Sequence, residues 1–366
     1  MSRETKKTIL LLGKNGILGS AIAKTATWLD KLTRSQFRSQ FIAWDRADLD
    51  ITDKKQVSQK INRLKPAIVI NAAGYTDVDG AEIDRRTAFK VNRDAVGYIA
   101  EACRQIGARL IHFSTDYVFD GTQPSGYVED DVKDLKPLNV YGESKRIGEL
   151  RITNYELRYF IIRTSWLYGS GGRNFVDTML KRAIDGQKEF KVVDDQFGLP
   201  TYTVDLAERV LWIVERIDQL ESGVYHVVNS KLKHASSAVR RRGGTQNSTC
   251  LIGSPPKRRK PQLHVMPTWH GKTKSFMKPA GITWYEFAME IFRLARKVGI
   301  LSDLPKVEPC MTDEFPRQAK RPKYGALINT KLPEMREWKQ ALRAYLKTQN
   351  SKFKTTTKNF KTFLFF

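Results

Sequence analysis

The sequence lacks a long apolar stretch. None of its 366 residues falls in an uninterrupted apolar run of the about 18 residues that a membrane-spanning helix needs, so we expect no membrane partner. The opening residues, MSRETKK, contain no apolar signal region, which predicts a cytoplasmic location. Cysteine is also scarce. Three widely spaced cysteines form no disulfide framework, and this fits a reducing compartment.

Acidic residues are missing from two segments. Residues 231–280 hold twelve Lys and Arg and no Asp or Glu, and residues 347–366 hold five Lys and no acid. Most of the net charge of +24 lies in these segments, so the rest of the chain is only mildly basic. No aromatic interleaving and no known binding motif accompanies the basic clusters, and we therefore expect no nucleic-acid partner.

Short apolar runs alternate with longer amphipathic ones over the first half of the chain. We expect strands at 8–13, 41–44, 67–74, 108–116 and 159–169, and helices at 20–32, 53–65 and 81–106. Strands that are apolar throughout are typical of a parallel sheet covered on both faces by helices. The order predicts an α/β fold of the Rossmann type, with a doubly wound parallel sheet.

The pattern becomes less regular after residue 170. We expect helices at 174–186, 204–217 and 282–300 and a strand at 223–230. The last helix opens with Thr283 and Glu286, which have the Thr-x-x-Glu spacing of a capping box. Residues 231–280 show neither helical nor strand periodicity, and we interpret them as a disordered insertion into an otherwise continuous fold.

A glycine-rich loop, GKNGILG, follows the first predicted strand. Gly13, Gly16 and Gly19 permit a tight turn, close approach of a pyrophosphate and close helix packing, and they frame Asn15, Ile17 and Leu18. This context predicts a dinucleotide site. Asp45, at the end of the second strand, is placed to bind the adenosine ribose of NAD, whereas Arg46 could accept the 2′-phosphate of NADP. NADPH and NADH both remain open, and Asp50 and Ile51 are expected in the same site.

Small and polar residues follow the third and fourth strands. NAAGYT brings Gly74, Tyr75 and Thr76 to the edge where ligands of such sheets bind. FSTDYVFDG brings Phe113, Thr115 and Asp116 to the same edge, where a hydroxyl can donate to a developing oxyanion. In PLNVYGESKRIGE, Tyr141 and Lys145 are one helical turn apart and share a face.

The motifs together resemble a known family. GKNGILG, NAAGYT, STDYVFDG, NVYGESKRIGE, RTSWLYG and DDQFGLPT occur in an order and spacing similar to the extended short-chain dehydrogenase/reductases. Within that group the pattern is most similar to the dTDP-4-dehydrorhamnose reductases, over about residues 6–230 and 281–346. The resemblance implies a Rossmann domain at 1–170, returning around 200–230. It also implies a smaller C-terminal substrate-binding lobe at 171–346, followed by a basic tail at 347–366.

The resemblance also implies an activity. Thr115, Tyr141 and Lys145 match the family's catalytic set. In that set the tyrosine protonates a ketone and the threonine polarises the carbonyl. The lysine lowers the pKa of the tyrosine and holds the nicotinamide ribose. The expected reaction is hydride transfer from NADPH or NADH to C4 of dTDP-4-keto-L-rhamnose, a nucleotide sugar. Asp116, Tyr117 and Trp166 are expected to contact the substrate, although core packing is the alternative for Trp166.

Departures from the family leave alternatives open. Ala21 stands where some members have a glutamate for a magnesium site that links a dimer, so we expect no metal, and monomer and homodimer both remain possible. His234, His264, His270 and Cys250 lie in the insertion without zinc-ligand spacing. The family also has a non-catalytic NADP-binding relative, the regulatory subunit of methionine adenosyltransferase. A third possibility is a reductase that the insertion has inactivated.

Overall fold

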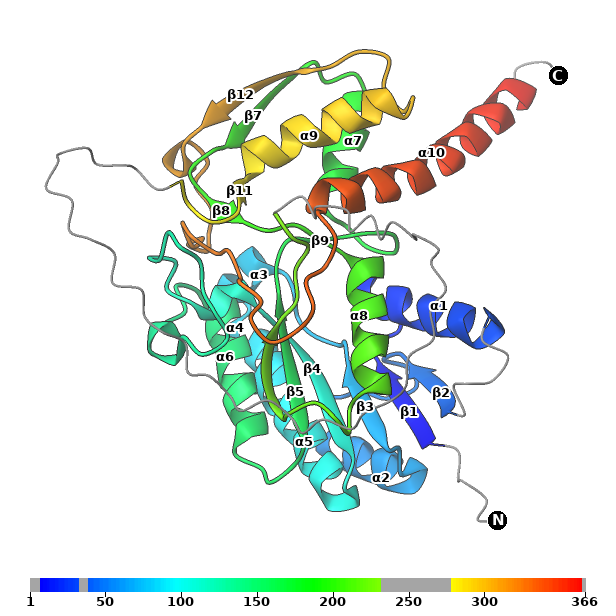
Figure 1. The fold of residues 1–366 in the computed structure, drawn as a ribbon, viewed down its shortest axis with the longest axis vertical. Helices are drawn as coiled ribbons and strands as arrows, with labels where there is room; N and C mark the ends of the chain where they lie inside the picture. The colour runs from blue at the N-terminus through cyan, green and yellow to red at the C-terminus, as the bar shows by residue number, and fades with distance from the viewer. Residues whose placement is uncertain (1–6, 33–38, 232–277, 364–366) are drawn as a thin grey trace, which may run out of the picture. The chain divides into compact units, whose positions relative to one another are not determined.

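A computed structural model describes residues 7–32, 39–231 and 278–363 (Figure 1). The predicted insertion at 231–280 therefore lies almost entirely outside the described residues. The chain divides into a unit of residues 1–233 and 279–366 and a second unit of 234–278.

A six-stranded parallel sheet forms the centre of the first unit. Its strands are β1 (Lys7–Leu12), β2 (Ser39–Trp44), β3 (Ile68–Asn71), β4 (Arg109–Thr115), β5 (Tyr159–Thr164) and β10 (Gly223–His226). Their spatial order is β10-β5-β4-β3-β1-β2, so the chain winds outward in both directions from between β1 and β3. Parallel pairing with helical crossovers confirms the predicted doubly wound α/β fold.

Successive side chains of β1 enter two separate cores. Ile9 and Leu11 pack with α1 (Ile17–Leu32) and α8 (Thr203–Glu215) on one face of the sheet. Leu10 and Leu12 pack with α2 (Lys54–Leu64) and α5 (Ala95–Ile106) on the other face. This two-sided burial is the physical reason that the strand sequence is apolar without alternation.

Two predicted elements are interrupted in the structure. The predicted helix at 81–106 consists of α3 (Val78–Ile83), α4 (Arg85–Phe89), a π-helical turn (Lys90–Asp94) and α5. The predicted strand at 159–169 is divided into β5 and β6 (Leu167–Tyr168). The division falls at Trp166, whose φ of 46° is incompatible with a strand. Neither interruption follows from apolar spacing.

A smaller lobe contains α7 (Phe175–Ile184), β7 (Glu189–Val193), β8 (Phe197–Gly198), β9 (Thr201–Tyr202), β11 (Ile282–Thr283), α9 (Trp284–Lys297) and β12 (Lys306–Cys310). The Thr283 hydroxyl accepts from Glu286 N and the Glu286 carboxylate accepts from Thr283 N, both at 3.1 Å, which confirms the capping box. Helix α10 (Trp338–Phe363) runs across the tail boundary expected at residue 347 (Figure 1).

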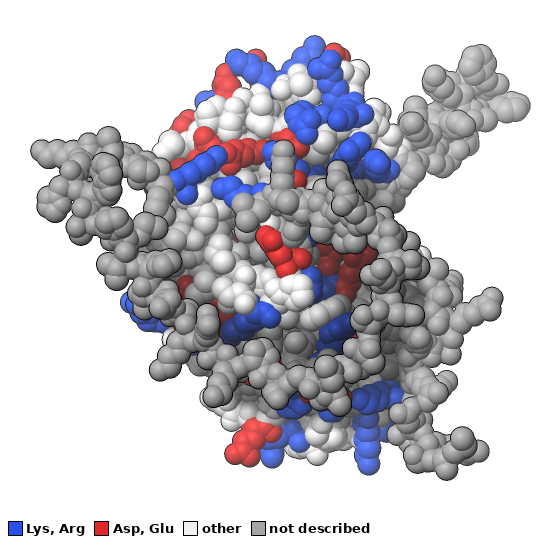
Figure 2. All heavy atoms as spheres, viewed as in Figure 1, with Lys and Arg blue, Asp and Glu red and all other residues white. Residues whose placement is uncertain are grey.

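Figure 2 shows one face of the molecule. On this face the described Lys and Arg side chains lie among Asp and Glu side chains. In the described part of the chain, no helix is both long and apolar enough to cross a bilayer.

Candidate active site

The glycine loop lies between the ends of β1 and β3 and the start of α1. Gly13 has a φ of 83°, and a Cβ there would lie 2.7 Å from Ala73 N. A Cβ on Gly19 would lie 2.0 Å from the Gly13 carbonyl oxygen. Both positions therefore require glycine, the first for its backbone conformation and the second for the close approach of the helix to the loop.

A cavity of about 600 Å³ opens beside this loop. Its lining includes these predicted cofactor residues: Gly13, Asn15, Gly16, Asp45, Arg46, Asp50, Ile51, Gly74 and Tyr75. Ile17, Leu18 and Gly19 begin α1, with Leu18 buried in the core, and Thr76 is exposed nearby. Trp44, Leu49 and Lys90 also line the cavity and were not predicted. The small residues and polar groups of this cavity fit a dinucleotide.

The Asp45 carboxylate is held by the glycine loop and by the turn that follows β2. The carboxylate accepts from Asn15 Nδ2 at 3.0 Å and lies 3.3 Å from Lys14 Nζ. The backbone N–H of Asp48 has the largest effect and lowers the pKa of Asp45; burial opposes that shift, and the Lys14 ammonium and the backbone N–H of Ala47 lower the pKa further. The Arg46 side chain is 87% exposed and lies 3.7 Å from Asp50. The edge of the cavity thus offers an acceptor for a ribose and cations for a phosphate.

The structure brings the three predicted catalytic residues together. Tyr141 and Lys145 lie on α6 (Val140–Thr153), which Asn139 caps by accepting from Gly142 N at 2.8 Å. Thr115 ends β4, and its hydroxyl is within hydrogen-bonding reach of Tyr141. Burial raises the pKa of Tyr141, and the Thr115 hydroxyl opposes that shift.

Lys145 is buried between the end of β4 and the loop that follows β3. Its ammonium donates to the Phe113 carbonyl at 2.9 Å, and a Cβ on Gly74 would lie 3.2 Å from its Nζ. Burial lowers its pKa to about 8, and the Glu149 carboxylate opposes that shift. Lys145 is therefore adjacent to Gly74 in the cofactor cavity and shares a helix face with Tyr141.

Asn92 is a site residue that spacing did not reveal. It lies in the π-helical turn, is fully buried, and donates to the Tyr75 carbonyl at 2.9 Å and the Ser144 hydroxyl at 3.0 Å. Its Oδ1 accepts from Tyr75 N at 2.9 Å. The amide therefore connects the loop after β3 to α6, the helix that carries Tyr141 and Lys145. Single-turn π-helices often mark functional sites, but they have no periodic sequence signal.

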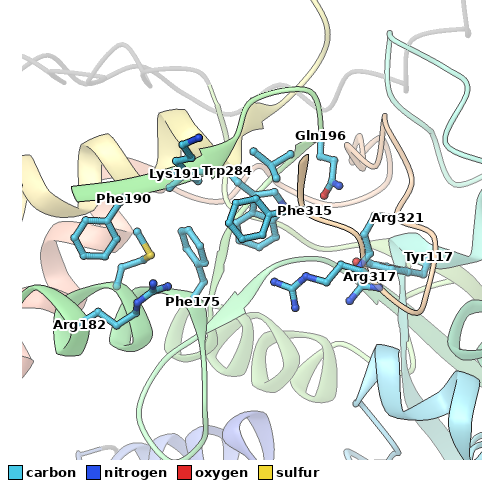
Figure 3. Close-up of a pocket in the computed structure, with 13 residues that line it drawn as sticks. Tyr117, Phe175, Arg182, Phe190, Lys191, Gln196, Trp284, Phe315, Arg317 and Arg321 are labelled. Carbon is cyan, nitrogen blue, oxygen red and sulfur yellow. The ribbon is translucent and has the colours of Figure 1, made fainter. Parts of the chain in front are cut away.

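Asp116 and Tyr117 continue from Thr115 toward the smaller lobe. Thr115 donates to Asp116 Oδ1 at 2.9 Å, and burial raises the pKa of Asp116 to about 7. The Tyr117 ring meets the Tyr141 ring edge-on, with centroids 5.6 Å apart. Tyr117 also lines a second cavity of about 360 Å³, which reaches into the smaller lobe (Figure 3).

This second cavity combines basic and aromatic side chains. Its walls include Arg182, Lys191, Arg317 and Arg321, with Phe175, Phe190, Trp284 and Phe315. The charged groups come from α7, β7 and the loop after β12, and Figure 3 shows them on different sides of the space. Such a lining suits an anion attached to a flat ring.

Trp166 lies behind this wall. Its indole stacks on that of Trp284 with centroids 3.5 Å apart and an interplanar angle of 11°. Residue 198 must be glycine, because a Cβ there would lie 2.5 Å from Trp166 Cε2. Trp284 lines the cavity, whereas Trp166, the tryptophan expected to contact substrate, is not among its lining residues. Local sequence spacing does not indicate that residue 284 packs at this site.

Comparison with known proteins identifies the family. Residues 7–244 and 257–351 match the family described as the RmlD substrate binding domain. The dTDP-4-dehydrorhamnose reductase of Aggregatibacter actinomycetemcomitans is 33% identical over 343 residues, covering 92% of this chain and 97% of the relative. The chain belongs to the dTDP-4-dehydrorhamnose reductase family. This confirms the resemblance predicted from the six motifs.

Solved structures of the dTDP-4-dehydrorhamnose reductase family share the fold. The crystal structure of the Clostridium acetobutylicum dTDP-4-dehydrorhamnose reductase is 34% identical and has a TM-score of 0.72, covering 94% of this chain and 99% of that chain. The Bacillus anthracis dTDP-4-dehydrorhamnose reductase in complex with NADP is 30% identical, with a TM-score of 0.71, covering 93% of this chain and 99% of that chain.

Proposed function

We propose that this chain reduces the C4 ketone of dTDP-4-keto-L-rhamnose to the alcohol of dTDP-L-rhamnose, with NADPH or NADH as the hydride donor. The observation that supports this most directly is the position of Tyr141, Lys145 and Thr115. Lys145 is adjacent to Gly74 in the glycine-loop cavity, and Tyr141 contacts Tyr117 in the basic and aromatic cavity.

Tyr141, Thr115 and Lys145 have separate roles in the proposed reaction. The reduced nicotinamide supplies a hydride to C4 when the cofactor is bound. Tyr141 supplies the proton that O4 needs, and Thr115 hydrogen-bonds to that oxygen as its negative charge grows. Lys145 holds the nicotinamide ribose, and its positive charge favours the tyrosinate that forms after proton transfer. Burial of all three side chains keeps water from competing for these hydrogen bonds.

The second cavity fits the nucleotide end of the substrate. Arg182, Lys191 and Arg317 are placed to neutralise the diphosphate. Aromatic rings such as Trp284 and Phe175 offer surfaces against which thymine can pack. The sugar would then extend past Tyr117 toward Thr115 and Tyr141. Asp116, buried beside Thr115, is placed to contact the sugar.

The glycine-loop cavity fits either nicotinamide cofactor. Asp45 offers an acceptor for the adenosine ribose of NADH, and Lys14 and Arg46 offer cations for the 2′-phosphate of NADPH. On this assignment residues 1–170, with 200–230, hold the cofactor, and residues 171–346 supply the substrate-binding lobe.

The proposal is tested by oxidation of NADPH or NADH in the presence of dTDP-4-keto-L-rhamnose. Replacing Tyr141 by Phe removes the proton donor, and we expect kcat to fall by about 10²–10⁴-fold with cofactor binding retained. Tyr98→Phe, on α5, is the matched control and should keep the parental rate. A parent that binds NADPH but never oxidises it would instead support the non-catalytic alternative. A Tyr141→Phe variant as fast as the parent would remove Tyr141 from the mechanism.

A further inference from the structure

The loop at residues 315–321 connects the two lobes. Its sequence is FPRQAKR, and we call it the arginine loop because Arg317 and Arg321 line the second cavity, to which we assign the nucleotide. The loop follows β12 and a short turn that is held by Thr312, whose backbone N–H donates to Asp195 at 3.0 Å. Both residues of that anchor belong to the smaller lobe.

Asp79, on α3, attaches the arginine loop to the cofactor-binding lobe. Its carboxylate accepts from Arg321 through two nitrogens, at 2.9 and 2.8 Å, and from the backbone N–H of Ala319 at 3.1 Å. Arg317 lies 3.6 Å from the same carboxylate. One carboxylate therefore contacts three positions of a segment about 240 residues away in sequence.

A second contact comes from the start of the catalytic helix. Asn139, the residue that caps α6, donates from Nδ2 to the Lys320 carbonyl at 2.7 Å. The arginine loop is thus held by α3 and by the cap of the helix that carries Tyr141. Because α3 follows the NAAGYT segment, the loop is attached close to the cofactor cavity on one side and to the catalytic helix on the other.

The two arginines of the loop differ in exposure and in hydrogen bonding. Arg321 is 16% exposed, and its guanidinium is committed to Asp79 and to the Ala319 carbonyl, which it meets at 2.7 Å. Arg317 is 60% exposed, and among the described residues its ion pair is the longer contact with Asp79. Figure 3 shows its guanidinium extending into the cavity between Arg321 and Phe175. Arg317 is the group available to an anion, whereas Arg321 maintains the loop.

We infer that Asp79 is a positioning residue for the nucleotide sugar. It fixes the arginine loop through Arg321 and Ala319, so that Arg317 meets the substrate diphosphate in a pre-organised position. This inference rests on the proposed function, because it assigns a diphosphate to the second cavity. Asp79 contacts neither reacting atoms nor cofactor, so its effect should appear in substrate binding and not in the chemical step.

A purely electrostatic role for Asp79 would give the opposite result. A carboxylate near Arg317 competes with a diphosphate, and its removal alone would strengthen binding of the anion. Arg317 is mostly exposed, however, so solvent and salt screen that competition. The hydrogen bonds that order the loop are shorter and less exposed. Their loss should dominate, because the freed loop must then be ordered by the ligand.

The test compares Asp79→Asn with the parent and with Glu143→Gln. Glu143 forms a similar two-bond ion pair with Arg85, at 3.1 and 3.0 Å, but lines neither cavity. We measure the Kd of dTDP, thymidine and NADPH, and the KM and kcat for dTDP-4-keto-L-rhamnose. For Asp79→Asn we expect dTDP binding and KM to weaken by about tenfold, with thymidine, NADPH and kcat unchanged. Glu143→Gln should match the parent.

Arg317→Met provides a second variant. It should weaken dTDP binding to a similar extent, and combining it with Asp79→Asn should add little, because both changes act on one contact. Equal or tighter dTDP binding in Asp79→Asn would overturn the inference, and so would parallel losses of dTDP, thymidine and NADPH binding. A parent that neither binds dTDP nor oxidises NADPH with the keto sugar would overturn the proposed function itself.

Discussion

The ion pair between Glu149 and Arg163 gives a prediction about stability that can be worked out from the structure. Glu149 lies on α6 and Arg163 on β5, and both side chains are 1% exposed. Arg163 donates from Nε and Nη2 to the two carboxylate oxygens at 2.9 and 2.8 Å. Removing one member of such a pair typically costs about 3–5 kcal/mol, because the other charge stays buried without compensation.

Replacing Glu149 by Gln should therefore destabilise the fold by about 3–5 kcal/mol. Arg163 has little other support: among the described residues its Nη1 has no hydrogen-bond partner, and its remaining charge contact is the Phe119 ring at 5.0 Å. Chemical denaturation of parent and variant, followed by circular dichroism, measures the difference. Glu143→Gln is the control, since its pair with Arg85 is exposed and should contribute about 0–1 kcal/mol.

A double variant tests the cause. Arg163→Met in the Glu149→Gln background removes the uncompensated cation, so part of the lost stability should return. Glu149 also raises the pKa of Lys145, so the single variant should make Lys145 easier to deprotonate. If Glu149→Gln loses no more stability than the Glu143 control, the reasoning about this buried pair is wrong.

Two further predictions concern single positions. The ordinary pKa of Asp116 is 3.8 and burial raises it to about 7, so the folded chain keeps a proton that the unfolded chain has lost. The parent should therefore lose stability relative to Asp116→Asn as pH rises from about 4 to 7, by up to about 4 kcal/mol in denaturant titrations, and a constant difference would contradict this. Gly19→Ala places a Cβ 2.0 Å from the Gly13 oxygen and should weaken NADPH binding by at least about tenfold. Gly97→Ala, where the nearest atom is a flexible Arg151 carbon at 3.6 Å, should leave NADPH binding unchanged, and equal Kd values in the two variants would refute the packing argument.

The cofactor half of the site was largely predictable, because its residues lie at fixed places in a repeating unit. Gly13, Gly16 and Asp45 follow parallel strands, and the carboxyl ends of those strands meet at one edge of the sheet. One helical turn places Tyr141 and Lys145 on a shared helix face, but their catalytic roles were predicted from the resemblance of the surrounding motifs to the family. Asn92 was not predicted, because a π-helical turn leaves no mark in the apolar spacing.

The second cavity could not be predicted, because segments that are far apart in the sequence form it. Asp79 and Arg321 are 242 residues apart, and Trp166 and Trp284, which stack on each other, are 118 residues apart in the sequence. Local periodicity carries no information about such pairs, since it reports which face of an element is buried and not what buries it. The sequence alone determined the doubly wound sheet, the glycine loop and the helix that carries Tyr141 and Lys145, because short-range geometry specifies these elements. Only the tertiary structure decided which basic side chains line the second cavity and which tryptophan forms its wall.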